Sequence, residues 1–359
     1  MDQVYPIAVE KRSTSLLFLI VILLTGCARH PPIAPLPQAA RQVPAIFVDH
    51  NRVATTEISV VTYNVAGLPF PARTGTGSAM RRIHLAMTRA WQGDRRPDIL
   101  LLQEAFVPSA TRLILSAGLA NHVRGPSPGD RRAVAVRDPE QNNLKGRKWR
   151  KGEGWPKLAN SGLALGTNFG ILAHVAEPFG RRSCAGLDCL ANKGVTLTAL
   201  HLPGVPEPLL VLNTHLNARG AARVSRRRTD YAHRQQVCEM AELLAREWRG
   251  RYPLIYAGDF NTRGTARRFD YKDENLPGEL AHRFCHNEPQ RCRVEMSWDG
   301  DEPWRDTQDL QGYASSARVT IEPVAIEAEF DEPVGGRRLS DHDALRVTFR
   351  MSWRVDEAR

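Results

Sequence analysis

The chain is built around short apolar runs that are rich in β-branched and large aliphatic residues, and each run is bounded by polar or turn-forming residues. Runs of this length and composition predict strands. Because 42% of the residues are hydrophobic, there are enough apolar side chains for a large core, which excludes a disordered or collagen-like protein. Strands are expected at Ile58–Val65, Ile99–Leu102, Leu163–Leu165, Val195–Leu200, Leu209–Leu212, Leu254–Ala257, Val319–Ile321 and Leu345–Phe349.

Two segments between these runs have the periodicity of amphipathic helices. In Asp230–Trp248, apolar residues recur every three or four positions on one face, and Arg234, Glu239 and Arg246 are assigned to the opposite, polar face. A second helix is expected over Ala79–Trp91. No internal repeat or second linker interrupts the pattern, so residues 51–359 are expected to form one mixed α and β domain.

The first residues have the three parts of a secretory signal. Lys11 and Arg12 precede the apolar run Leu16–Leu24, which is about half as long as a membrane-spanning helix must be. Leu24–Cys27 resembles the lipobox of bacterial lipoproteins, in which the signal is cut before a cysteine that then receives a lipid. The resemblance implies a signal at residues 1–26 and lipidation of Cys27. The alternative is a plain signal peptide followed by a chance cysteine.

A proline-rich stretch without apolar periodicity follows the cysteine, so residues 27–50 are expected to be an extended tether. A lipid on Cys27 would hold the protein at a membrane of the cell envelope. Ala28 stands where the resemblance places an aspartate in lipoproteins retained at the inner membrane. We therefore expect a monomer anchored to the outer membrane, facing the periplasm or the exterior, with secretion as the alternative.

The formal net charge is +10, which attracts nucleic acids and anionic membrane surfaces alike. Lys and Arg residues concentrate in residues 131–157 and in a second cluster. Each cluster is either a binding surface for such anions or an ordinary solvated surface. The second cluster consists of Arg223, Arg226, Arg227 and Arg228.

Five cysteines remain when Cys27 is set aside. In an oxidising compartment, short-range pairs are plausible, so Cys184 with Cys189 and Cys285 with Cys292 are disulfide candidates, with Cys238 left over. The spacing lacks two paired C-x-x-C knuckles, and we expect no structural zinc site.

Polar side chains stand where several of the predicted strands end or begin. A carboxylate, amide or imidazole there is held rigidly at the rim of a sheet and can reach a ligand. Any one of them alone is more often a turn or cap residue. The set comprises Asn64, Glu104, His215, Asn217, Asp259, Asn261, Asp341 and His342.

Together these residues supply what phosphoester hydrolysis requires. Oxygen ligands such as Glu104, Asn64, Asp259 and Asn261 suit a hard cation, with Mg²⁺ the expected cofactor and Mn²⁺ or Ca²⁺ the alternatives. Histidines can act as acid and base near neutral pH. The metal and the amides would stabilise charge on the phosphoryl oxygens.

Six segments, in order, resemble the motifs of the endonuclease/exonuclease/phosphatase superfamily, which has the DNase I-like fold. The resemblance covers residues 58–350 and implies a four-layer α/β sandwich, in which two mainly antiparallel sheets pack face to face with helices outside. The segments are Thr62–Pro69, Pro97–Glu104, Ser161–Leu165, Asn213–Leu216, Ala257–Thr262 and Leu339–Asp343.

The resemblance also implies a role for each residue. Glu104 is the main Mg²⁺ ligand, with Asn64 and Asp341 beside it. Asp259 orients or activates the attacking water, and Asn261 holds a phosphate oxygen. His342 takes the water's proton or pairs with the phosphate, and His215 stabilises the pentacovalent state or protonates the leaving oxygen. No covalent intermediate is expected.

A carboxylate on an earlier strand usually supports one histidine in this superfamily. Asp309 is the candidate here, through a loose match, and an ordinary surface aspartate is the alternative.

The segment Cys184–Val195, which contains Asn192, Lys193 and Gly194, is similar to an element of bacterial neutral sphingomyelinases and related phospholipase C-type enzymes. It implies that Lys193 contacts a phosphate, and Asn217 is assigned to substrate as well. An exposed lysine beside a turn glycine is the alternative. Sphingomyelinases present an exposed aromatic hairpin late in the chain, and here only the scattered Trp298, Trp304 and Tyr313 occur.

We therefore expect a Mg²⁺-dependent phosphodiesterase that releases phospholipid headgroups. A secreted or periplasmic nuclease is the second hypothesis, because the arginine clusters would contact nucleic-acid phosphates. A phosphomonoesterase for inositol phosphates or similar small anions is the third. A binding protein without catalysis is disfavoured because every catalytic position is filled.

Overall fold

The computed structural model describes residues 44–132, 147–297, 302–331, 333 and 336–355. All of them belong to one compact unit. The predicted signal, the lipidation site Cys27 and most of the predicted tether lie outside the described residues. Residues at the end of the tether, Phe47–Val48, form strand β1 and pair with β2.

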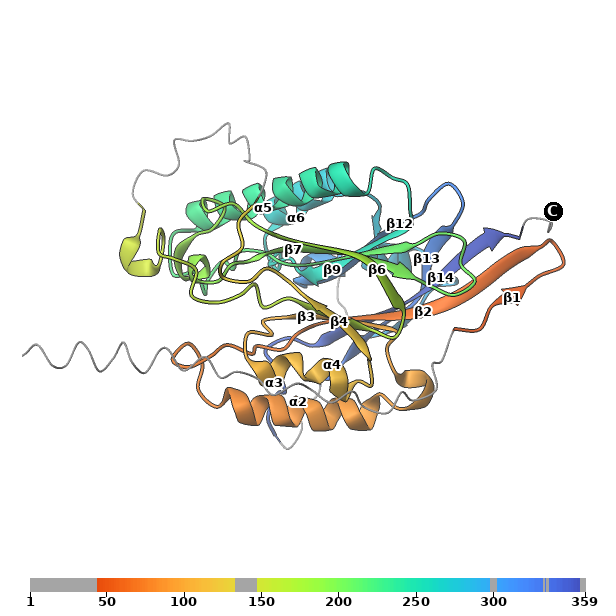
Figure 1. Ribbon diagram of the computed structural model, residues 1–359, viewed down its shortest axis with the longest axis horizontal. Helices are drawn as coiled ribbons and strands as arrows, with labels where there is room; N and C mark the ends of the chain where they lie inside the picture. Colours follow the sequence, from red (N-terminus) through yellow and green to blue (C-terminus); the bar gives the residue numbers. More distant parts are fainter. Residues whose placement is uncertain (1–43, 133–146, 298–301, 332, 334–335, 356–359) are drawn as a thin grey trace, which may run out of the picture. The chain divides into compact units, whose positions relative to one another are not determined.

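Two sheets make up the centre of the domain (Figure 1). Each contains mostly antiparallel pairs and one or two parallel pairs. The first sheet has the order β11 (Arg293–Glu295), β13 (Thr320–Glu329), β14 (Ala344–Arg354), β2 (Val53–Asn64), β3 (Ile99–Gln103), β5 (Ala164–Thr167) and β4 (Asn121–Arg124). The second has the order β10 (Glu279–Leu280), β12 (Asp309–Ala314), β9 (Leu254–Asp259), β8 (Leu209–His215), β7 (Gly194–His201) and β6 (Gly170–Pro178).

Helices cover the outer face of each sheet, so the domain has four layers (Figure 1). Helices α2 (Thr76–Ala90), α3 (Pro108–Thr111) and α4 (Leu113–Ser116) cover the first sheet, and α5 (Arg226–Glu247) and α6 (Ala266–Asn275) cover the second. The remaining helical elements are α7 (Ala281–Asn287) and the 3-10 turns η1 (Gly93–Arg95), η3 (Trp149–Lys151), η4 (Gly186–Leu190) and η5 (Pro303–Arg305). Among the described helices, none has the length and apolarity to cross a membrane.

Strand alternation explains the layering. On β2, Ile58 and Val60 point into the core between the two sheets, whereas Val61 and Tyr63 pack against α2. Successive side chains of a strand face opposite ways, so a strand with apolar residues on both faces is covered on both faces. The sequence of β2 therefore requires a layer on each side, and the predicted sandwich is confirmed.

Two buried amides of the second sheet bond to the backbone of the first. Asn213 Nδ2 of the second sheet donates to the carbonyl oxygens of Leu102 and Ala164 in the first, at 3.2 and 3.1 Å. Gln311 Nε2 of the second sheet donates to the carbonyl oxygens of Val60 and Leu345, at 3.0 and 2.9 Å. Buried amides must be hydrogen-bonded, so these bonds fix how one sheet lies on the other.

The eight predicted strands are confirmed, and so are both predicted helices. One assignment within α5 is wrong. Glu239, assigned to the polar face, is fully buried. Its carboxylate accepts hydrogen bonds from the Ser183 hydroxyl and from Gly180 N, and Arg132 Nη1 lies 3.4 Å away. These partners come from distant segments and cover the helix face that the sequence pattern left to solvent.

Candidate active site

Parallel strand pairs bring the predicted residues to one edge. β2 and β3 are parallel and are joined through α2, so Asn64, the last residue of β2, and Glu104, directly after β3, leave the first sheet at the same end. In the second sheet, β8 and β9 are parallel and joined through α5, and their last residues, His215 and Asp259, are register partners. The carboxyl ends of parallel strands are where such folds bind ligands.

Antiparallel neighbours add the two remaining groups. Asp309, the first residue of β12, is the register partner of Asp259. His342 precedes β14, whose Leu345 pairs with Thr62 near the end of β2. A strand that runs antiparallel to a neighbour begins where that neighbour ends, so both side chains reach the same edge.

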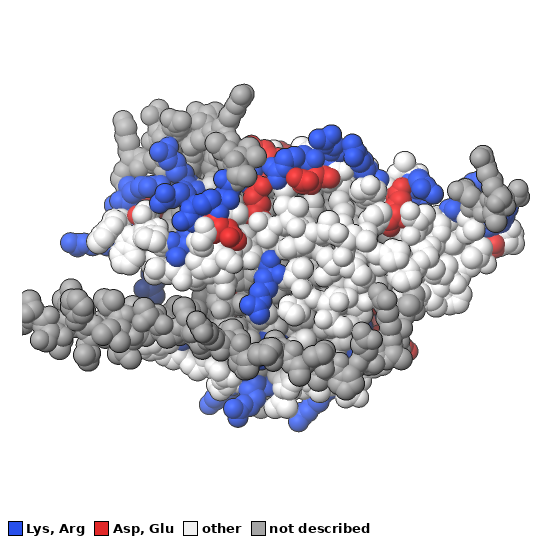
Figure 2. Space-filling model, viewed as in Figure 1, with Lys and Arg blue, Asp and Glu red and all other residues white. Residues whose placement is uncertain are grey.

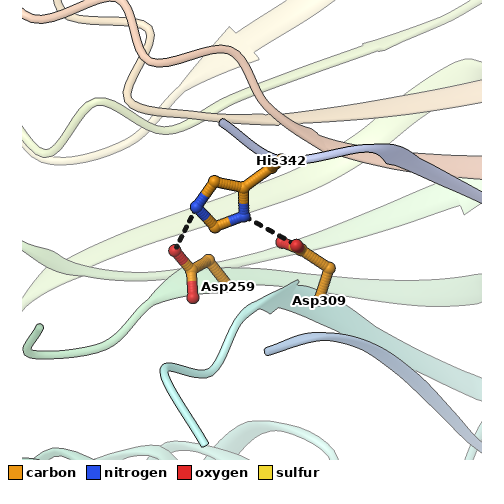
Figure 3. Close-up of side chains that lie close together, drawn as sticks. All are labelled: Asp259, Asp309 and His342. Atoms are coloured by element: carbon orange, nitrogen blue, oxygen red, sulfur yellow. Dashed lines mark hydrogen bonds and ion pairs between the residues drawn. The ribbon is translucent and has the colours of Figure 1, made fainter. Parts of the chain in front are cut away.

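His342 lies between two aspartates (Figure 3). Its Nδ1 is 2.7 Å from Asp309 Oδ2, and its Nε2 is 3.8 Å from Asp259 Oδ2. The side-chain amide of Gln308 lies 3.0 Å from Nε2. Burial alone would lower the pKa of His342, but the Asp309 and Asp259 carboxylates raise it to about 10. The histidine is therefore oriented through Nδ1, and Nε2 faces Asp259.

His215 is held in the opposite electrostatic environment. Its Nε2 lies 3.1 Å from Lys193 Nζ and 3.4 Å from Asp259 Oδ2. Lys193 Nζ also donates to Asp188 Oδ2 and to the Leu216 carbonyl, both at 2.9 Å. Burial and the positive charges of Lys193 and His342 hold the pKa of His215 well below its usual range. This environment favours the uncharged imidazole of His215.

Asp259 lies at the centre of the cluster and is buried. Asn64 Nδ2 donates to its Oδ2 at 3.0 Å, and the backbone amide of Asn261 donates to its Oδ1 at 2.9 Å. Burial, with the nearby Asp309 carboxylate, raises the pKa of Asp259 to about 7. The carboxylate is thus oriented by two donors, as a group that binds or activates a water molecule must be.

Glu104 fits the role of a metal ligand. Burial raises the pKa of its carboxylate, and no Lys or Arg in the described part of the chain forms an ion pair with it. Among the described basic groups, His215 Nε2 lies 4.0 Å from Glu104 Oε1. Its backbone has a φ of 52°, in the left-handed region that costs a non-glycine residue energy and often marks functional sites. A carboxylate of this kind, with the side-chain amide oxygen of Asn64 as a second ligand, suits Mg²⁺.

The two other predicted metal ligands, Asn64 and Asp341, differ in how deeply they are buried. Asn64 is buried, and its Oδ1 accepts from Ala66 N at 3.0 Å. The Asp341 side chain is 74% exposed and lies 4.0 Å from Arg73 Nη1. Asp259, Asp309 and His342 also present atoms within 4.8 Å of one another, close enough to hold a cation. Because a protonated His342 already offsets these two carboxylates, Glu104 is the better metal candidate.

Three residues assigned to phosphate or substrate form hydrogen bonds with the protein itself. Asn217 is fully buried: its Oδ1 accepts from Ala185 N at 2.9 Å and its backbone amide donates to Gln236 Oε1. Asn261 Nδ2 donates to the Leu216 carbonyl at 3.1 Å. Lys193 is 6% exposed and contacts His215 directly.

The sequence interpretation missed two residues of this site. Asp188, in η4, pairs with Lys193 and also accepts from Ala218 N at 2.5 Å. Gln308 contacts His342, and its position next to Asp309 was the one available signal. Nothing in the sequence links Asp188 to Lys193, because their contact depends on the path of the loop between β6 and β7.

A cavity of about 500 Å³ opens beside His342. Its walls include Asp309, predicted to support a histidine, and the predicted metal ligand Asp341. Three further aspartates and two arginines also line it: Asp306, Asp331, Asp343, Arg263 and Arg338. Among the charged side chains of the wall, aspartates therefore outnumber arginines.

The structure contains both predicted disulfides and places two of the three aromatic residues named above. Cys184–Cys189 and Cys285–Cys292 are disulfides, and Cys238 is a free thiol. Trp304 and Tyr313 are buried, so neither forms an exposed aromatic surface. Trp298 lies outside the described residues.

The stacked sheets, the outer helices and the strand order define a DNase I-like sandwich. No family model matches the chain, and no curated protein matches it either. Among solved structures, the chain is similar to sphingomyelinase C from Streptomyces griseocarneus, with 18% identity, a TM-score of 0.55 and coverage of 81% of this chain and 99% of that one.

Two other solved structures give similar values. A mutant of beta toxin from Staphylococcus aureus with bound magnesium ions has 15% identity, a TM-score of 0.55 and coverage of 81% of this chain and 99% of that one. TDP2 from D. rerio, complexed with a single strand DNA product, has 16% identity, a TM-score of 0.52 and coverage of 82% and 98%. At these identities the likeness establishes the fold.

Proposed function

We propose that the protein hydrolyses phosphodiesters with the help of Mg²⁺. The observation that carries the proposal is the convergence of Asp259, His342, His215 and Glu104 at one edge of the sandwich, with His342 oriented by Asp309 at 2.7 Å. Two histidines in different electrostatic environments beside a buried carboxylate are suited to moving protons and stabilising negative charge. The solved relatives with magnesium or a DNA product support the same class of reaction.

In this proposal, Asp259 positions the attacking water, since Asn64 and the Asn261 amide fix its two oxygens. His342 presents Nε2 to the reacting group while Asp309 holds Nδ1. His215, with Lys193 behind it, faces the developing negative charge of the phosphoryl group. Glu104, Asn64 and Asp341 would hold Mg²⁺, which supplies positive charge to the phosphoryl oxygens when bound.

The preferred substrate class is a phospholipid whose headgroup carries a positive charge. The cavity beside His342 is lined by more aspartates than arginines, and carboxylates attract a cationic headgroup and repel a polyanion. Similarity to a sphingomyelinase C supports this choice. Lipidation of Cys27, with attachment to the outer membrane, would place a monomeric enzyme next to such a substrate.

A nuclease is the second candidate, because Lys and Arg side chains are prominent on the surface shown in Figure 2. The relative with a DNA product supports this alternative. Basic surfaces give sequence-independent contacts to nucleic-acid phosphates.

The test is a parallel assay of the full chain carrying Cys27→Ser, with Mg²⁺ or with EDTA. Sphingomyelin vesicles, phosphatidylcholine vesicles, plasmid DNA and a small phosphomonoester are offered separately, with His342→Ala as the inactive control. Release of phosphocholine that EDTA abolishes supports the proposal. Cleavage of plasmid alone assigns the nuclease function, and release of phosphate from the monoester alone assigns the third hypothesis.

A further inference from the structure

A short segment far from the catalytic residues in sequence exposes three large apolar side chains. Residues 147–158 contain η3, and in this segment Trp149 is 65% exposed, Trp155 is 37% exposed and Leu158 is 63% exposed. The two tryptophan rings lie against each other with centroids 5.2 Å apart. Exposed apolar side chains that cluster in this way mark interaction surfaces.

Hydrogen bonds to the rest of the domain hold the segment so that these side chains stay exposed. Glu153, in the middle of the segment, is buried, and its carboxylate accepts from Lys148 N at 2.6 Å and from Gly186 N at 2.9 Å and pairs with Arg228. At the end of the segment, Leu158 N donates to the Leu190 carbonyl at 2.7 Å. The segment is therefore fixed at its middle and its end, with the tryptophans directed outward.

Basic side chains surround the apolar ones. In the part of the chain that the structure describes, no carboxylate forms an ion pair with Arg147, Lys148, Arg150 or Lys151. Glu153, the one acidic residue of the segment, is engaged by Arg228. Arg147, Trp155 and Lys157 line a cavity of about 370 Å³ together with Arg181 and Arg182. Figure 2 shows Lys and Arg side chains gathered at the end of the view where residues near 150 lie in Figure 1.

We propose that the surface formed by Trp149, Trp155, Leu158 and the surrounding Lys and Arg residues docks the protein onto an anionic lipid bilayer. Tryptophan has an apolar body and a polar N–H, and it favours the boundary between headgroups and acyl chains. Basic residues beside it are attracted to anionic headgroups. The exposed aliphatic side chain of Leu158 adds apolar area that a nucleic-acid base would not use, which favours a bilayer.

The surface is physically linked to the active site. The turn η4 holds the segment through Gly186 and Leu190, and Asp188 of the same turn pairs with Lys193, which contacts His215. A bilayer bound to this surface would lie close to the element that orients His215. The docking proposal concerns binding and does not depend on catalysis, so each can fail alone.

The experiment uses the full chain with Cys27→Ser, which removes any lipid anchor, and vesicles of phosphatidylcholine with phosphatidylglycerol. Brominated lipids quench only tryptophans that enter the bilayer. Emission from the parent should be quenched, and the variant Trp149→Phe/Trp155→Phe should lose that quenching. Trp248→Phe, which changes a half-buried tryptophan on another surface, is the matched control and should keep it. Equal quenching in the parent and the double variant, or none in either, would overturn the proposal.

The charge contribution is tested by sedimentation with the same vesicles. Replacing Arg147, Lys148, Arg150 and Lys151 with Gln should lower the partition coefficient at least tenfold and remove the preference for phosphatidylglycerol. The matched control replaces four exposed arginines elsewhere, Arg81, Arg89, Arg249 and Arg354, and should change it much less. Equal losses in the two variants would reduce the effect to net charge and overturn the surface assignment. Tryptophan quenching by a single-stranded oligonucleotide, with none by vesicles, would reassign the surface to nucleic acid.

Discussion

Nδ1 of His342 lies 2.7 Å from Oδ2 of Asp309, and the two residues belong to different sheets of the sandwich. Asp309 begins β12 in the second sheet, and His342 precedes β14 in the first. The orientation of this histidine therefore depends on how the sheets pack. It links the inter-sheet hydrogen bonds of Asn213 and Gln311 to the geometry of the catalytic edge.

The pairing predicts that Asp309→Asn lowers kcat by about a hundredfold, the scale of a misoriented acid or base. KM should change less than kcat, because Asp309 Oδ2 is engaged by His342 Nδ1. The measurement is steady-state kinetics on whichever phosphodiester the protein cleaves. Asp306→Asn, which changes a neighbouring wall residue that does not contact His342, is the control. A rate in Asp309→Asn equal to that of the control would remove the role of this pair.

The environment of Glu104 predicts that Mg²⁺ stabilises the wild-type protein and not Glu104→Gln. At a Mg²⁺ concentration about 100 times the Kd, the stabilisation should be about 2.7 kcal/mol. In EDTA the variant should be at least as stable as the wild type, since burial disfavours the charged carboxylate. Thermal unfolding with and without Mg²⁺ measures both effects. Equal stabilisation of the two proteins by Mg²⁺ would place the metal elsewhere.

Lys193 is expected to matter for activity as well as stability. Lys193→Met removes the ammonium group next to His215 and leaves Asp188 without its ion-pair partner, so we predict a loss of about 1–3 kcal/mol of unfolding free energy and a rate reduction of at least about tenfold. Urea unfolding and kinetics test this. The control is Lys157→Met, because Lys157 is also part-buried but donates to the Ala191 carbonyl. An identical rate reduction in both variants would argue against a specific role for Lys193.

The buried carboxyl group of Glu239 is expected to make the free energy of unfolding depend on pH. Burial is the main cause that raises the pKa of this residue from 4.5 to about 7. Because the pKa is higher in the folded protein than in the unfolded chain, the protonated form favours folding. That contribution is fully present below pH 4.5 and is lost as the pH rises through 7. Relative to Glu239→Gln, the wild type should lose about 3 kcal/mol between pH 4 and pH 8.

Urea unfolding of both proteins across this range measures the difference. Ser183→Ala removes a hydroxyl donor to Glu239 but keeps the carboxyl group, so it should retain the pH dependence. A difference between wild type and Glu239→Gln that does not change with pH would show that Glu239 ionises normally in the folded protein.

The strands that carry the site were predictable because their sequences are continuous aliphatic runs. Ile99–Leu102 and Leu254–Ala257 are buried on both faces, and the polar residues after them could be assigned to the sheet edge. Strand β12 gave no such signal, since Gln311 and Gly312 interrupt its apolar pattern. Gln311 is buried because it bonds to backbone oxygens of the other sheet, a partner that the local sequence does not reveal.

Burial of polar side chains was the main feature that local patterns could not predict. Asn217 was assigned to substrate from its place after a strand, yet contacts from Ala185, Gln236 and Arg268 enclose it. Glu239 is likewise buried by contacts with distant residues, since the hydrogen-bond donors to its carboxylate lie more than 50 residues away in sequence. Tertiary packing decides the environment of such residues, and spacing along the chain carries no information about it.

The most direct test of the catalytic account is hydrolysis of bis(p-nitrophenyl) phosphate, a chromogenic phosphodiester that is neither lipid nor nucleic acid. The full chain with Cys27→Ser is compared with His342→Ala and Glu104→Gln, each with Mg²⁺ and with EDTA. The account predicts release of p-nitrophenol that EDTA stops and that falls by at least about a hundredfold in both variants. Release at the wild-type rate in His342→Ala, or release that persists in EDTA, would contradict it.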